Sequence, residues 1–67
     1  MDKTKMYFAR FSYTDSNGDL IEDSSIIELS YMELNDNAIK RKIGHTNSLD
    51  DIGIAYWDIK LLIVTLL

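Results

Sequence analysis

The fold is decided by residues 5–29, which read KMYFARFSYTDSNGDLIEDSSIIEL. Two runs that are rich in aromatic and β-branched residues flank the sequence DSNGD, and this pattern predicts two strands joined by a tight turn. Asn17 followed by Gly18 readily adopts the positive φ values that such turns require. We therefore expect an antiparallel hairpin with strands at Lys5–Thr14 and Leu20–Leu29.

Side chains of a strand alternate between its two faces, and in the first strand apolar residues fall on both. In the first strand one face carries Tyr7, Ala9, Phe11 and Tyr13, and the opposite face carries Met6, Phe8, Arg10 and Ser12. In the return strand Ile21, Ile27 and Leu29 share a face.

A capping box follows the hairpin at Ser30-Tyr31-Met32-Glu33, where serine and glutamate side chains bond each other's backbone N–H groups. It predicts a helix that continues to about Ile43, with basic residues at its negative end and Gly44 in the left-handed closing position. A surface helix needs only one apolar stripe, and this one has two, so we expect one to cover the sheet and the other to meet a partner. The stripes are Tyr31, Leu34 and Ala38, and Met32, Ile39 and Ile43.

The remaining segment predicts a short helical turn at Asn47–Asp51, ended by Gly53, and a last strand at Tyr56–Leu66. We expect Trp57, Ile59, Leu61 and Ile63 on one face of that strand. The run of Leu61, Leu62, Ile63 and Val64 is apolar on both faces, which is typical of a strand buried on both sides. The order strand, strand, helix, strand predicts an α+β fold with a small three-stranded antiparallel sheet and one main helix.

The 67 residues predict a single domain, 1–67, with a thin core. No cysteine is present to form disulfides, so we expect further burial from a second subunit, in a homodimer that meets through Leu61, Leu62, Ile63 and Val64. The sequence has one histidine, which leaves little for a zinc site, and it has no glycine-rich phosphate loop. No nucleophile is spaced from a base as in a catalytic site, so we expect no metal, no cofactor and no catalysis. We expect a binding protein and not an enzyme.

Charge is distributed unevenly along the chain. Between Arg10 and Lys40 there is no basic residue but seven acids, namely Asp15, Asp19, Glu22, Asp23, Glu28, Glu33 and Asp36. A negative field disfavours nucleic acid and suits the basic surface of a DNA-binding protein, although such a run can also serve solubility alone. We read no export signal, and the apolar end is shorter than the about 20 residues that span a bilayer. We therefore expect a cytoplasmic protein without membrane contact.

Three segments carry a resemblance to a known family: DSNGD, LSYMEL at Leu29–Leu34, and NSLDDI at Asn47–Ile52, which leads into DIKLLI. In this order they resemble the small inhibitors of uracil-DNA glycosylase encoded by small tailed phages of Bacillus. Those inhibitors have a Leu-Ser-x-Phe-Glu run at the helix start and Asn-Thr-Val-Asp-Glu-Ile before the last strand. The family's tyrosine one turn further along the helix falls here at Asp36 or Ile43, and this chain has about two extra helical turns.

The resemblance implies a homodimer that mimics DNA in the cleft of a host uracil-DNA glycosylase, inside the infected bacterium, and that holds the enzyme's inserted leucine in an apolar pocket. The family's phenylalanine corresponds to Met32 and its glutamate to Glu33. With these two, we expect Glu28, Tyr31 and Asp36 to contact the partner. The alternatives are a DNA mimic aimed at a restriction or CRISPR nuclease, and an antitoxin-like regulatory module that neutralises a basic toxin.

Overall fold

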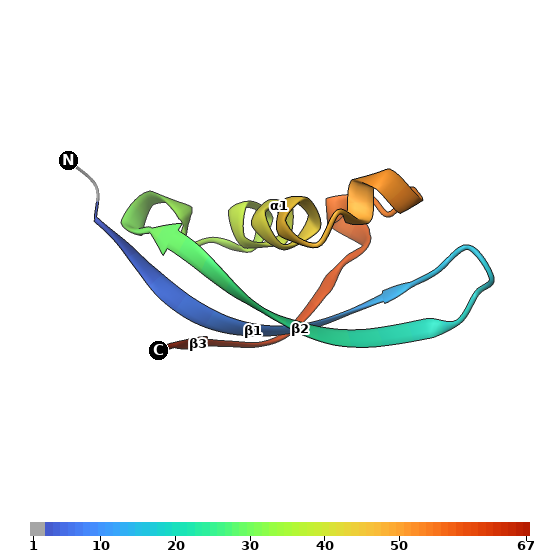
Figure 1. Ribbon diagram of the computed structural model, residues 1–67, viewed down its shortest axis with the longest axis horizontal. Coiled ribbons are helices and arrows are strands. Elements are labelled where there is room, and N and C mark those ends of the chain that lie inside the picture. Colours follow the sequence, from blue (N-terminus) through green and yellow to red (C-terminus); the bar gives the residue numbers. More distant parts are fainter. Residues whose placement is uncertain (1–2) are drawn as a thin grey trace.

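The protein is a three-stranded antiparallel sheet covered on one face by a layer of short helices (Figure 1). A computed structural model describes residues 3–67. The strand order is β2-β1-β3, which confirms the predicted α+β fold. The strands are β1 (Thr4–Thr14), β2 (Leu20–Ser30) and β3 (Lys60–Leu66); the helical layer holds α1 (Asp36–Thr46) and three 3-10 turns, η1 (Tyr31–Glu33), η2 (Leu49–Ile52) and η3 (Tyr56–Asp58).

The hairpin forms where the sequence predicts it, with register from Thr4 opposite Ser30 to Thr14 opposite Leu20. Its turn is closed by a 2.9 Å hydrogen bond from the Asp15 N–H to the Asp19 carbonyl. The Asp15 carboxylate accepts two further backbone N–H groups, and Gly18 takes a φ of 84°. This end of the hairpin extends beyond the helical layer, which gives the molecule its length of 42 Å (Figure 1).

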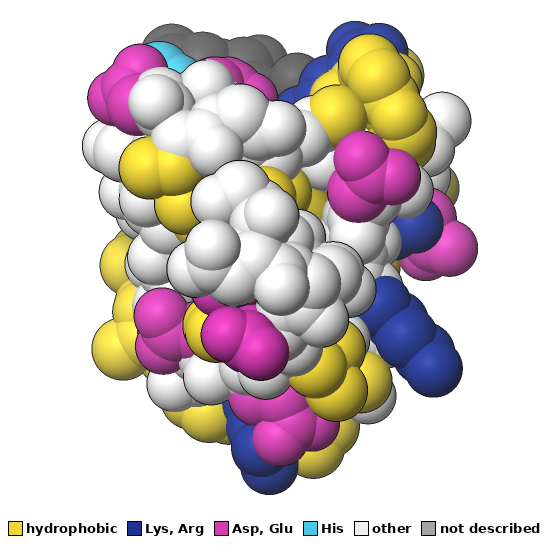
Figure 2. Space-filling model, turned by 90° about the vertical axis from the view of Figure 1, so that its right-hand side faces the viewer, with side chains coloured by type: hydrophobic (Ala, Val, Ile, Leu, Met, Phe, Trp, Pro, Cys, Tyr) yellow, Lys and Arg dark blue, Asp and Glu magenta, His cyan; other side chains and the backbone are white. Residues whose placement is uncertain are grey.

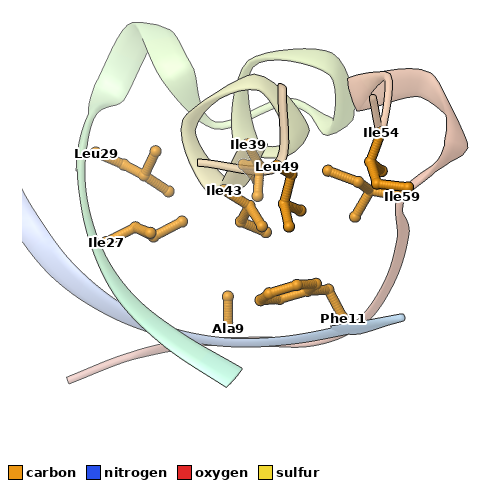
Figure 3. Packing of buried hydrophobic residues seen from close by; sticks show 9 residues of the cluster. All are labelled: Ala9, Phe11, Ile27, Leu29, Ile39, Ile43, Leu49, Ile54 and Ile59. Atoms are coloured by element: carbon orange, nitrogen blue, oxygen red, sulfur yellow. The ribbon is translucent and has the colours of Figure 1, made fainter. Parts of the chain in front are cut away.

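The core lies between the sheet and the helical layer, and its members point toward one another in Figure 3. The face of β1 that carries Ala9 and Phe11 is buried, and Ile27 and Leu29 of β2 complete the floor. The helical layer and the segment before β3 supply Ile39, Ile43, Leu49, Ile54 and Ile59.

The main helix begins later and ends later than predicted. The capping box forms, but only on the single turn η1, after which Leu34 leaves helical geometry with ψ at 60°. Asn35 then acts as a second N-cap, because its side-chain oxygen accepts the Ala38 N–H at 3.0 Å. Two capping signals five residues apart therefore divide one predicted helix into a short turn and α1.

Gly44 does not close the helix, so that prediction is wrong. It lies inside α1 and is buried, and a Cβ built on it would lie 3.7 Å from Cδ1 of Ile59. The helix ends at Thr46, and the side-chain amide of the next residue, Asn47, caps it by donating to the Ile43 carbonyl at 2.9 Å. The turn predicted after it is confirmed as η2, which Gly53 ends with a φ of 82°.

The last strand is shorter than predicted because its first residues form η3. A bulge in β3 then changes which faces its side chains occupy. Phe11 pairs with Leu61 while Arg10 pairs with Ile63, so Leu62 is the extra residue. The expected common face of Trp57, Ile59, Leu61 and Ile63 is therefore wrong: Leu61 packs against the core and Ile63 lies on the opposite face.

Candidate functional site

The turn η1 presents a small surface at the start of the helical layer. We call Tyr31, Met32, Glu33 and Asp36 the helix-start surface. Tyr31 and Met32 are 81% and 69% exposed, although both are large and apolar or aromatic. Asp36 is exposed in the first turn of α1. The structure therefore brings these four of the five predicted contact residues into one short segment.

Glu33 is held by contacts on both sides. Its Oε1 accepts the Ser30 backbone N–H at 2.9 Å, and its Oε2 lies 3.2 Å from Nζ of Lys42 on α1. The Ser30 hydrogen bond, followed by the Lys42 hydrogen bond and charge, holds the pKa of the Glu33 carboxyl below its usual range. The carboxylate is thus ionised and fixed in direction beside Met32.

Glu28, the fifth predicted contact residue, lies on the other face of the sheet. Its neighbour Leu29 points into the core, and register pairs Glu28 with Met6 on the uncovered face. Because neighbouring side chains of a strand point to opposite faces, the sheet separates Glu28 from the helix-start surface.

Exposed carboxylates lie on β2, which is an edge strand of the sheet, and in the turn just before it. We call Asp19, Glu22, Asp23 and Glu28 the acidic edge; all four are exposed. The Asp15 carboxylate is occupied by the turn, as described above. Figure 2 views the hairpin end of the molecule and shows acidic side chains spread over it, not gathered in one cluster.

The four residues predicted for a dimer interface divide between two environments. Leu61 and Val64 pack against the core, whereas Leu62 and Ile63 are 38% and 47% exposed. Ile63 belongs to an apolar group on the uncovered face of the sheet. We call this group the open-face patch; its members are Met6, Phe8, Ile26 and Ile63.

Two features were missed by sequence reasoning. A cavity of about 280 Å³ lies between the start of β1 and η1, lined by Lys3, Lys5, Tyr7, Leu29, Tyr31 and Leu34. Arg41 lies over the ring of Tyr56, 4.6 Å from its centroid, and Tyr56 contacts the exposed Trp57 edge to face. The alternation of Lys3, Lys5 and Tyr7 indicates that these side chains share one side of the chain at the start of the first strand, which is the side that lines the cavity. Nothing in the sequence pairs Arg41 with Tyr56.

Within residues 3–67, no three metal-ligating side chains lie together, and no helix has the length and apolar character to cross a membrane. Comparison with protein families, curated proteins and solved structures finds no match to this chain.

Proposed function

We propose that the protein inhibits a uracil-DNA glycosylase of a bacterial host, in the host cytoplasm, by occupying the DNA-binding cleft of the enzyme. The observation that supports this most is the exposed Met32 side chain next to the fixed, ionised Glu33 carboxylate. DNA-binding proteins contact phosphates with basic groups and often insert an apolar side chain between bases. A carboxylate can replace the phosphate, and a flexible methionine can pack against the inserted side chain.

The acidic edge supports the same proposal at longer range. Glu22, Asp23 and Glu28 lie on β2, which rises about 3.3 Å per residue, and Asp19 lies in the turn just before it. The four carboxylates therefore extend negative charge along this edge of the sheet, which suits a basic cleft. Complementary charge of this kind mainly raises the rate of association.

We also propose that the inhibitor is a homodimer joined at β3. Both β2 and β3 have an unpaired edge, and charged side chains on an edge hinder pairing with another strand. The edge of β2 carries carboxylates, whereas Lys60 is the one charged residue among the seven of β3. A second copy at β3 would cover Leu62 and Ile63 and extend the open-face patch. This burial would support a core of only nine buried apolar residues in the described chain.

Substitution of Met32 tests the proposed contact. Met32→Ala removes an apolar anchor, and truncation of such an anchor typically costs about 2 kcal/mol of binding, or roughly 30-fold in affinity. The matched control is Ile52→Ala, which truncates an exposed apolar side chain on η2. We expect weaker glycosylase binding for Met32→Ala alone, with unfolding temperatures like that of the parent. Equal glycosylase binding by Met32→Ala and Ile52→Ala would contradict a contact at Met32.

A further inference from the structure

The cavity beside η1 shares Tyr31 with the helix-start surface, but Met32 and Glu33 do not line it. A 3-10 helix has three residues per turn, so Tyr31 and Leu34 lie on the same side of η1. Both line the cavity, whereas Met32 and Glu33 do not. In Figure 1 this turn lies above the sheet end where β1 begins. A ligand in the cavity would thus bind one side of η1 and leave the Met32 side free.

The cavity combines apolar walls with unpaired positive charge. The apolar side chains of Leu29 and Leu34 and the ring of Tyr7 line it, and Leu29 is buried. Lys3 and Lys5 lie on the same side of the chain as Tyr7, because alternate residues of an extended segment share a face. In residues 3–67 the one salt bridge joins Lys42 to Glu33, so neither lysine has a carboxylate partner there. Two ammonium groups beside tyrosine rings favour an anion that carries a flat ring.

The size of the cavity limits that ligand. A closed apolar cavity of about 150 Å³ holds benzene. At about 280 Å³ the present cavity accommodates a larger ring system but not an oligonucleotide. Tyrosine rings stack on nucleobases, and lysine binds phosphate as a point charge. We propose that this cavity binds a nucleoside monophosphate, with the base between Tyr7 and Tyr31 and the phosphate at Lys3 and Lys5.

The test is titration of the intact protein with adenosine and uridine 5′-monophosphates, followed by the amide NMR signals of residues 3–7 and 29–34. We expect saturable shifts at submillimolar ligand, and binding at least about tenfold weaker for the nucleosides without phosphate and for inorganic phosphate alone. Lys5→Gln should weaken binding about tenfold, and Tyr31→Ala at least about fivefold. Lys60→Gln, an exposed lysine outside the cavity, should bind like the parent.

Three results would overturn the proposal: no saturation at millimolar nucleotide, equal binding of nucleotide and nucleoside, or parental affinity in Lys5→Gln. None of these readouts uses a glycosylase. Their outcome therefore leaves the proposed inhibition untouched, and loss of inhibition leaves this site untouched.

Discussion

Glu33 connects the end of β2, the turn η1 and the middle of α1 through its bonds to Ser30 and Lys42. These contacts exist only in the folded chain, so the carboxyl has a lower pKa folded than unfolded. Their contribution to stability is therefore complete above the unfolded pKa of about 4.3 and is lost as pH falls through the folded pKa. Glutamine at this position keeps much of the capping bond but does not titrate.

We expect the unfolding temperature of Glu33→Gln to depend less on acidification below about pH 4.3 than that of the parent. Thermal unfolding followed by circular dichroism across this range measures the difference. The control is Glu28→Gln, which removes a carboxylate that has no hydrogen bond or salt bridge in the described chain. It should follow the parent. Parallel curves for the parent and Glu33→Gln would contradict the stabilising role.

Gly44 offers a second test at the scale of one residue. Alanine is favoured over glycine inside a helix by about 1 kcal/mol, and the added methyl would make ordinary contact with Ile59 at 3.7 Å. We expect Gly44→Ala to raise the unfolding temperature by about 4–8 °C. Gly53→Ala should lower it, because the φ of 82° there costs a residue with a Cβ about 1–2 kcal/mol. A lower unfolding temperature for Gly44→Ala would contradict the helical position of Gly44.

Among the elements, the position of the hairpin could be predicted best, since its turn is a local signal, whereas its register is fixed only by the pairing of β1 with β2. The start of the main helix could not be predicted, because Ser30 and Asn35 both carry capping signals. Tertiary packing decides how long the helical segment after each of them is. The bulge at Leu62 could not be predicted either. In LLIVTLL every residue is apolar or β-branched, so no polar alternation marks the register, and only pairing with β1 fixes it.

The β3 edge gives a prediction at the scale of an element. Ile63→Glu introduces a charge into the proposed dimer contact, while Arg10 lies directly across the sheet and can pair with it in the monomer. We expect the parent to sediment at twice 7.7 kDa at micromolar concentration and the variant at 7.7 kDa. Ile52→Glu, on the helical layer, should remain dimeric. A monomeric parent would contradict the dimer.

For the whole molecule, the sequence shows which residues are apolar or acidic, but it does not show which of them lie together in the fold. Glu28, Glu33 and Asp36 lie close in sequence, yet the sheet separates Glu28 from the other two. The cavity depends on Lys5 and Tyr31, which approach each other only because β1 pairs with β2. Contacts between distant segments follow from register and packing, which a list of local motifs does not contain.

The most direct test of the proposed inhibition is a uracil-excision assay, in which the protein is titrated into a bacterial uracil-DNA glycosylase acting on uracil-containing DNA. We expect excision to fall to zero as the protein exceeds the enzyme. We also expect slower onset of inhibition at higher salt, because ions screen charge attraction beyond about 10 Å at 0.1 M. Undiminished excision in the presence of excess protein would contradict the proposed function.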